Sequence, residues 1–184
     1  NIESFEVGEI DSKTDWSKAL KKTDCVIHCA GRAHVFKELK NESLDIYRRI
    51  NVEGTINLAE QAAANGVKRF IFLSSIKVNG ERTDKSIKFK YNDIPKPEDS
   101  YGVSKWEAEK GLWKISKETG LEVVIIRAPL VYGPAVKGNL RRLIKLIQSR
   151  IPLPFSLIKN QRSLISIDNL VNLIIHCIDA HQAS

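Results

Sequence analysis

The sequence has no methionine and few cysteines. Its three cysteines, Cys25, Cys29 and Cys177, are an odd number and stand in apolar surroundings. This set predicts reduced thiols rather than a disulfide framework, and therefore a cytoplasmic protein. No apolar run reaches the roughly 18 residues that a membrane helix needs, and no secretory leader opens the chain, so no membrane partner is expected. Because a translation start is missing, we interpret the chain as a piece of a longer protein.

Acidic residues are absent from one long segment. Residues 123–167 contain eight basic side chains and no carboxylate, within a chain whose net charge is +7. A segment of one sign favours an anionic partner, although a solvated helix face with loop charges explains the same pattern. Interleaved aromatic residues and nucleic-acid-binding motifs are missing from it, so nucleic acid is not expected as a partner.

A metal site is not expected either. His28 alternates with Cys25 and Cys29 on an expected strand, so the imidazole and the thiols point to opposite faces. The tetrahedral geometry that zinc requires cannot be built from opposite faces of one strand.

What the sequence does contain is an alternation of short apolar runs with helical stretches. This pattern is typical of a parallel sheet covered by helices, and it predicts an α/β, doubly wound, Rossmann-like fold. We expect strands at residues 4–10, 25–29, 69–74, 121–126 and 163–167. Helices are expected at about residues 16–20, 43–64, 99–118, 139–149 and 168–179, with Asn65-Gly66 and Gly120 as stop signals. Residues 75–98 are long, polar and contain two prolines, which predicts a functional loop.

One helix carries a tyrosine and a lysine at a spacing suited to proton transfer. In Tyr101-Gly-Val-Ser-Lys105 the two side chains lie one turn apart on the same helix face. A nearby ammonium favours the phenolate, so we expect Lys105 to lower the pKa of Tyr101. A tyrosine of lowered pKa can exchange a proton with a substrate hydroxyl near neutral pH. By itself this spacing is weak, because it occurs by chance in many helices.

The surroundings of that helix strengthen the hypothesis. One expected strand ends in Ser74-Ser75, at the sheet edge where ligands bind in such folds. Another ends in Ala30-Gly31, whose small side chains let a flat cofactor approach the backbone. Asn51 stands inside a helix, where asparagine is a poor helix former and invites a functional explanation.

Five motifs in order then resemble the NAD-dependent epimerase/dehydratase family of extended short-chain dehydrogenases/reductases. They are His28-Cys-Ala-Gly31, Asn51-Val-Glu-Gly-Thr55, Phe72-Leu-Ser-Ser75 with Val78-Asn-Gly80, Tyr101-Gly-Val-Ser-Lys105, and Arg127-Ala-Pro-Leu-Val-Tyr-Gly-Pro134. The resemblance covers essentially all 184 residues. It is specific for the family and much less so for the substrate.

The resemblance implies a role for each matching residue. Tyr101 is the expected acid/base, Lys105 holds the nicotinamide ribose and tunes the tyrosine, and Ser75 bonds the reacting sugar oxygen. Tyr101 and Lys105 are also expected to bind NAD. Glu9 and Ile10 are expected beside the adenine, and Ala30 and Gly31 along the pyrophosphate and ribose. The remaining expected NAD-binding residues are Asn51, which supports the site, Ser74, and Ala128 and Pro129 beside the nicotinamide. Arg162 and Asn139 are expected to bind the nucleotide of the substrate, a role that suits the permanently charged fork of an arginine.

The implied activity is 4-epimerisation of a nucleotide sugar, such as a UDP-hexose or UDP-N-acetylhexosamine, through a 4-keto intermediate. An NAD(P)H-dependent reductase of a nucleotide-linked 4-keto-6-deoxy sugar and a non-catalytic NAD-binding protein stay open as alternatives. A dehydratase is set aside, because Ile76-Lys77 stands where dehydratases of the family carry Asp-Glu. Leu130 and Asn79 depart from common substrate-contacting residues, which leaves the sugar open.

The glycine-rich turn that seats the cofactor pyrophosphate, with the first two strands, should precede residue 1. NADP is therefore not excluded as the cofactor, and we expect this chain alone to bind NAD weakly or not at all. We expect residues 1–135 to form part of the NAD-binding domain. Residues 136–184 should begin a nucleotide-sugar-binding region that does not fold independently. The resemblance leaves a homodimer open.

Overall fold

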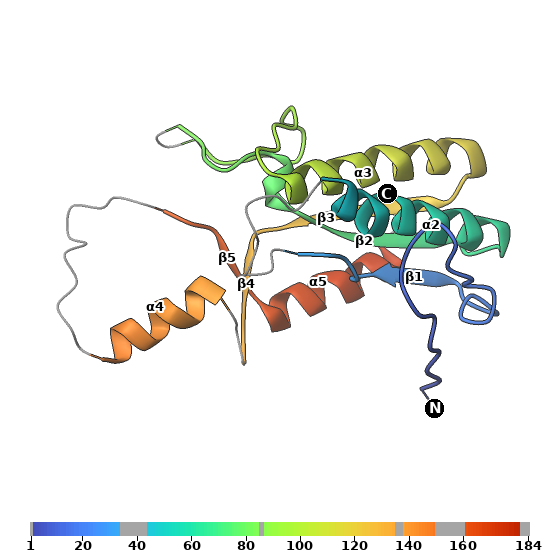
Figure 1. Cartoon of the computed structure of the whole chain (residues 1–184), viewed down its shortest axis with the longest axis horizontal. Helices are drawn as coiled ribbons and strands as arrows, with labels where there is room; N and C mark the ends of the chain where they lie inside the picture. The colour runs from blue at the N-terminus through green and yellow to red at the C-terminus, as the bar shows by residue number, and fades with distance from the viewer. Residues whose placement is uncertain (1, 34–43, 85–86, 135–137, 150–160, 181–184) are drawn as a thin grey trace.

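Three parallel strands form the central sheet in the computed structural model, which describes residues 2–33, 44–84, 87–134, 138–149 and 161–180. They are β1 (Cys25–His28), β2 (Arg69–Ser75) and β3 (Glu122–Ala128), in the order β1-β2-β3. The register pairs Cys25 with Arg69 and Ser75 with Ala128. All three strands run the same way, so their carboxyl ends meet at one edge of the sheet (Figure 1).

Helices cover one face of this sheet. One helical stretch comprises α1 (Leu44–Tyr47), the π-helix η1 (Arg48–Glu53) and α2 (Gly54–Ala64), and α3 (Ser100–Thr119) lies beside it (Figure 1). Alternate strand residues face these helices, so Phe70, Phe72 and Val123 are fully buried against Leu58 and Leu112. This layer is the larger of the two cores among the described residues.

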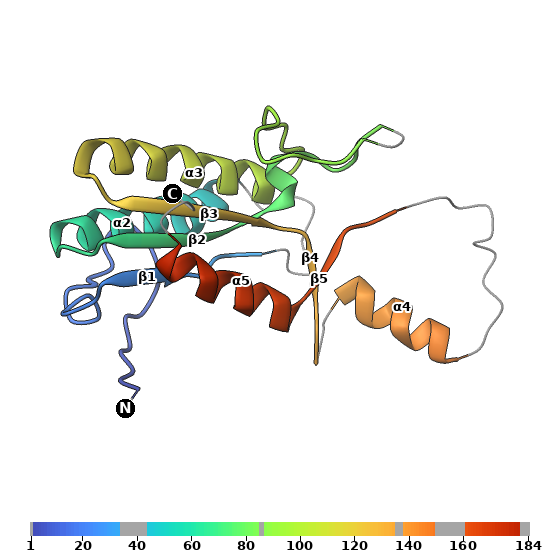
Figure 2. The ribbon, with the colours of Figure 1, turned by 180° about the vertical axis from the view of Figure 1, so that it is seen from behind.

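The opposite face is covered by α5 (Ile167–Asp179), as Figure 2 shows from behind. Ile71 and Val124 point to this side and pack with Leu170 and Cys177 of α5. A separate pair of short parallel strands, β4 (Leu130–Tyr132) and β5 (Leu164–Ser166), lies next to α5, and α4 (Gly138–Gln148) stands beyond them. Helices on both faces of a parallel sheet confirm the α/β, Rossmann-like prediction.

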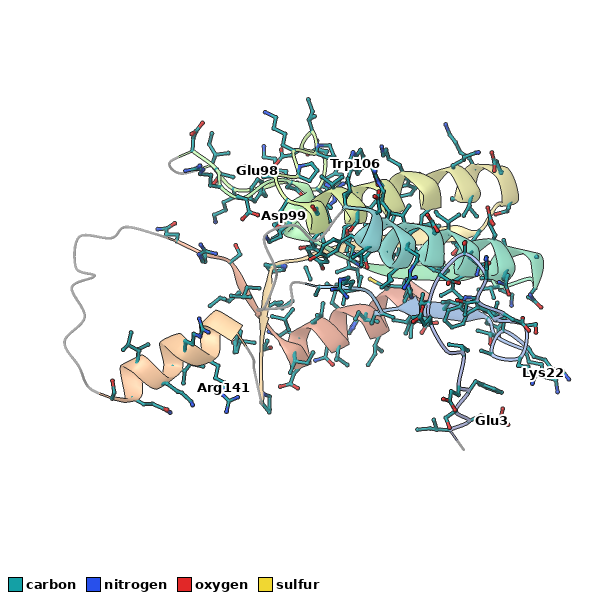
Figure 3. The ribbon with its side chains drawn as sticks, viewed as in Figure 1. Glu3, Lys22, Glu98, Asp99, Trp106 and Arg141 are labelled. Carbon is teal, nitrogen blue, oxygen red and sulfur yellow. The ribbon has the colours of Figure 1, made fainter. Side chains whose placement is uncertain are left out.

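The ends of α3 follow the sequence signals. Asp99 is the N-cap and accepts a hydrogen bond from Gly102 N at 2.7 Å, and Figure 3 shows it at the start of the helix. Gly120 ends the helix with φ 78°, a left-handed conformation that favours glycine. The short 3-10 turn η2 (Ile76–Val78) and the long polar loop precede α3. This helix therefore begins where the sequence predicts, close to the carboxyl end of β2.

Several expected elements differ from the structure. Residues 4–10 form no strand, because no described strand offers them a hydrogen-bonding partner. Residues 16–20 form only turns, with one bond from Leu20 N to Trp16 O. The strand β1 ends at His28, one residue earlier than the expected range 25–29. It is partly exposed, since it lies at the edge of the sheet among the described strands. The strand β4 was not predicted, because Pro129, Gly133 and Pro134 surround it.

The expected boundary at residues 135–136 lies outside the described residues. Within the described part of the chain, none of the helices combines the length and the apolar character needed to cross a membrane.

Candidate active site

A cavity of about 180 Å³ opens at the carboxyl edge of the sheet. The ends of all three strands and the first turns of α3 contribute to it. Its lining comprises Cys29, Gly31, Ala33, Leu73, Ser74, Ser75, Tyr101, Lys105, Ala128, Pro129 and Val131. Seven of the residues singled out in the sequence thus share one cavity, although they come from four separate segments of the chain.

Ser75, Tyr101 and Lys105 lie together in this cavity. A side-chain hydrogen bond joins Ser75 to Tyr101. The Ser75 hydroxyl also caps η2 by accepting from Lys77 N at 3.3 Å. The two contacts hold the serine between the end of β2 and the start of α3, so the hydroxyl and the phenol face each other at the sheet edge.

The pKa of Tyr101 corrects an expectation from the sequence. Burial raises this pKa above its usual value of about 10, and the charge of Asp99 adds to the rise. The hydrogen bond from Ser75 and the charge of Lys77 act in the opposite direction. The prediction that Lys105 lowers the pKa was therefore wrong for this structure, because burial dominates and the cation acting on the phenol is Lys77.

Lys105 is almost completely buried, and its ammonium is held from two sides. Nζ donates to the carbonyl of Leu73 at 3.0 Å and lies 4.4 Å from the centre of the Phe72 ring. Burial lowers the pKa of Lys105 to about 8, against the opposing influence of Cys29 and Glu109. The lysine is turned toward the end of β2, one turn along α3 from the phenol.

Asn51 stands in the π-helix η1 and is buried. Its side chain accepts from Arg32 N at 2.7 Å and donates to Arg32 O at 3.0 Å, and it donates to Ser104 Oγ at 2.9 Å. It thereby fastens the segment after β1 to α3. A Cβ at Gly31 would stand 3.0 Å from Asn51 Oδ1 and 3.4 Å from Lys105 Nζ. Glycine therefore lets the backbone after β1 lie close to these two side chains.

A second, larger groove adjoins the first cavity. It measures about 550 Å³ and is lined by Glu9, Ile10, Gly31, Arg32, Ala33, Arg49 and Ile50. The two share Gly31 and Ala33 as lining residues. Arg49 pairs with Glu9 at 3.2 Å across an exposed edge. The structure thus brings the expected adenine-binding residues Glu9 and Ile10 beside Gly31, next to the first cavity.

Of the other predicted site residues, two line neither hollow, one lines the cavity with its hydroxyl bonded elsewhere, and one has no described side chain. Ala30 is exposed and lines neither hollow. Arg162 is exposed, shortly before β5, and is also outside both. Ser74 lines the cavity, but its hydroxyl donates to Glu109 at 2.5 Å. Asn139 falls within α4, and its side chain lies outside the described residues.

Two charged residues beside the cavity were missed as site residues. Lys77 pairs with Asp99 and, at 2.8 Å, with Glu81; burial opposes its charge, but these carboxylates raise its pKa overall. Glu109 is fully buried and follows Lys105 by one helical turn. For Glu109 the sequence offered a signal: it follows Tyr101 and Lys105 at the same four-residue spacing and so lies on the same face of the helix.

Among the described residues, no cluster of three or more His, Cys, Asp or Glu side chains could hold a metal ion. His28 instead bonds Thr55 Oγ1 through Nε2 at 3.0 Å, in the core beneath the sheet edge.

Comparison with known proteins gives consistent matches. The model of the NAD dependent epimerase/dehydratase family matches residues 1–184. A UDP-glucose 4-epimerase from Vibrio cholerae is 54% identical over 98% of this chain and 55% of that protein. An N-acetyl-alpha-D-glucosaminyl-diphospho-ditrans,octacis-undecaprenol 4-epimerase from Escherichia coli O157:H7 is 29% identical over 94% of this chain and 50% of that protein.

A solved structure of UDP-glucuronic acid 4-epimerase from Bacillus cereus in complex with NAD superposes with a TM-score of 0.78 at 27% identity. The match covers 93% of this chain and 54% of that one. The chain spans about half the length of the curated relatives it matches.

Proposed function

Because the chain belongs to the NAD-dependent epimerase/dehydratase family, we propose that it is the catalytic part of a nucleotide-sugar 4-epimerase. The observation that carries this proposal is the hydrogen bond between Ser75 and Tyr101, beside Lys105 in one cavity at the sheet edge. The names of relatives that act on UDP-glucose and UDP-glucuronic acid support a UDP-linked hexose or N-acetylhexosamine as substrate. The sparse, unpaired cysteines support a cytoplasmic location.

The residues of the cavity divide the proton chemistry among them. As the phenolate, Tyr101 takes the proton of the sugar C4 hydroxyl on its oxygen as the 4-keto sugar forms, and as the phenol it returns that proton afterwards. Ser75 bonds the same sugar oxygen and keeps it beside the phenol. Burial favours the neutral phenol, and the hydrogen bond from Ser75 and then the charge of Lys77 oppose that preference when Tyr101 must act as a base.

NAD is the cofactor that these residues fit. Gly31 leaves the rim between cavity and groove without a side chain, and Lys105 presents an ammonium at that rim. Ala128, Pro129 and Lys105 would hold the nicotinamide riboside, Ala30 and Gly31 the pyrophosphate, and Glu9 and Ile10 the adenine. When bound, NAD supplies the chemistry of removing a hydride from the sugar carbon and returning it.

The nucleotide of the substrate would be bound by residues outside the cavity. Arg162 is exposed and offers a planar, permanently charged fork for a diphosphate, and Asn139 belongs to the helix α4. We assign both to the substrate side of the site.

The test uses the full-length protein with UDP-sugars and no added reductant. Steady interconversion of the C4 epimers supports the epimerase, whereas strict dependence on NADH or NADPH supports the 4-keto reductase instead. Tyr101→Phe should lower kcat about 100- to 10,000-fold, the usual range for a lost acid/base group. Tyr91→Phe is the matched control, because Tyr91 is an exposed loop tyrosine. Unchanged turnover in Tyr101→Phe would refute the proposal.

A further inference from the structure

An ion pair between a buried carboxylate and a partly buried guanidinium lies next to the cavity and takes no part in the proton chemistry above. Glu109 is fully buried, and Arg127 donates to its carboxylate from Nη2 at 2.7 Å and from Nε at 3.1 and 3.2 Å. The hydroxyl of Ser74 donates to the same carboxylate at 2.5 Å. Arg127 also donates to Asn79 Oδ1 at 3.2 Å.

This network joins three elements at the point where the site is built. Glu109 belongs to α3, Ser74 to the end of β2 and Arg127 to the end of β3. Ser75 follows Ser74 directly, and Ala128 follows Arg127, so both neighbours are cavity residues. Any shift of the carboxylate would therefore move the Ser75 hydroxyl and the Ala128 wall relative to the phenol.

The same carboxylate acts on the lysine. Tyr101, Lys105 and Glu109 follow one another at four-residue spacing on α3 and form one stripe facing the strand ends. The titratable groups around Lys105 are Cys29 and His28 from β1 and its end, and Tyr101 and Glu109 from its own helix. Among these, Cys29 and Glu109 favour the ammonium.

Stability alone does not explain a fully buried carboxylate paired with a largely buried guanidinium here. Removing two charges from water is expensive, and well-packed apolar residues of similar volume often serve as well or better. The network does, however, hold the strand ends in a fixed relation to α3, which apolar contacts specify less sharply.

We propose that Glu109 is a positioning residue of this site, which holds the ends of β2 and β3 in place and keeps a negative charge beside Lys105. The proposal rests on the proposed function, because it assigns Glu109 to the same reaction. It adds two separable effects: one of geometry, through Ser74 and Arg127, and one of charge, through Lys105.

The experiment compares Glu109→Gln, Glu109→Asp and Ser74→Ala in the full-length protein. Glu109→Gln removes the charge, and kcat should fall about 10- to 100-fold with little change in KM, as for a small misplacement of reacting groups. The pKa of Lys105 should fall below that of the unmodified protein, because one of the two groups favouring the ammonium is lost. NMR of ¹³C-labelled lysine measures this pKa without any turnover.

Glu109→Asp keeps the charge but shortens the side chain, so it should restore the Lys105 titration while kcat stays low. Ser74→Ala removes one hydrogen bond, leaves the ion pair, and tests the geometric effect if Glu109→Gln does not fold. Glu107→Gln is the matched control, since Glu107 pairs with Arg48 at 2.6 Å away from the cavity. It should leave kcat and the Lys105 titration unchanged.

Normal kcat together with a normal Lys105 titration in Glu109→Gln, or normal kcat in a folded Ser74→Ala, would overturn the proposal. If the unsubstituted protein does not interconvert any sugar, the proposed function fails by itself. The Lys105 titrations of the Gln and Asp variants then still decide whether Glu109 acts on the lysine.

Discussion

At the scale of single residues, burial decides the charge of the groups beneath the site. His28 is buried and packs against the rings of Phe70 and Phe72, with centroid distances of 6.0 and 5.9 Å, and it bonds Thr55. Burial, with a smaller contribution from the charge of Lys105, lowers the pKa of His28 from 6.5 to about 4. The imidazole is therefore neutral in the folded chain at neutral pH, as a core residue should be.

The lowered pKa of His28 predicts a loss of stability in acid. Between pH 6.5 and pH 4 the unfolded chain binds a proton at this site that the folded chain does not bind. The free energy of unfolding should therefore fall by about 2 kcal/mol from pH 7 to pH 5 on account of this residue. Urea unfolding at the two pH values measures it.

His28→Gln keeps a neutral polar side chain and should lose most of this pH dependence. His176→Gln is the control, because His176 is exposed on α5 and the dependence should persist. An equal slope in His28→Gln and the unsubstituted chain would contradict the assignment.

At the scale of the elements, the helix α3 is held against α2 by a glycine. A Cβ at Gly111 would stand 2.1 Å from Ile56 Cδ1 and 3.1 Å from Ile56 Cγ1. The glycine lies in a helix interior, where alanine has the better intrinsic propensity by about 1 kcal/mol. Close approach of the two helices, rather than helix formation, thus explains the residue, and this approach sets where α3 presents Tyr101 and Lys105.

Gly111→Ala should destabilise the chain by about 1–2 kcal/mol, because overpacking outweighs the gain in helix propensity. Ile56→Val removes the clashing methyl group, so the double variant should recover about 1 kcal/mol relative to the sum of the single changes. Chemical denaturation of the four proteins gives this coupling. Additive effects of the two substitutions would show that the helices are not in contact at this point. Lys114→Ala, on the exposed side of α3, is the control and should change the free energy of unfolding by less than about 0.5 kcal/mol.

The helix α5 is fastened to the sheet by one arginine. Arg69 is buried, and its Nη1 donates to the carbonyls of Cys177, Ile178 and Ala180 at 2.8, 2.9 and 3.0 Å. These carbonyls lie at the end of α5, where a cation is favourable. The other side of the guanidinium pairs with Glu122.

Arg69→Met should lower the free energy of unfolding by about 3 kcal/mol, because it leaves several helix-end carbonyls without a donor. Amide exchange in the last turn of α5 should increase more than exchange in α2. Lys68→Met is the neighbouring control: its ion pair with Asp24 is exposed, so the change should be within about 1 kcal/mol. Equal effects of the two substitutions would argue against the capping role.

At the scale of the whole molecule, the distribution of charge favours an anionic ligand. Five of the eight basic residues in the segment 123–167 belong to the described part of the chain. Three of these five are exposed on α4: Arg141, Arg142 and Lys145. Figure 3 shows Arg141 on α4, beyond the central sheet. Lys137, Arg150 and Lys159 lie outside the described residues. A nucleotide diphosphate fits the sign of this segment.

Binding of such a ligand should depend on salt. As ionic strength rises from about 0.01 M to about 0.1 M, the screening length falls from about 30 Å to about 10 Å, so KM for a UDP-sugar should rise in the full-length protein. The double substitution Arg141→Gln and Arg142→Gln should flatten that dependence, while Lys114→Gln on the exposed side of α3 should leave it in place. A KM independent of salt would show that these charges serve solubility only.

The sequence by itself determined the fold class, the main strands and helices, and the motifs that converge on one edge. Local signals were sufficient for these features. Apolar runs identified β2 and β3, Asp99 and Gly120 delimited α3, and helical spacing put Tyr101 and Lys105 on one face. Parallel strands share a carboxyl edge, so Ser75, Gly31 and Ala128 could be expected to meet there.

Only the tertiary structure decided the electrostatics of the site and the fate of the weaker elements. Burial, which depends on packing among distant segments, raises the pKa of Tyr101 and reverses the expectation from its neighbour Lys105. The direction in which a charged side chain turns is equally a property of the packing, as Lys105 shows at the carbonyl of Leu73. Residues 4–10 form no strand because pairing needs a partner in space, which no local pattern supplies.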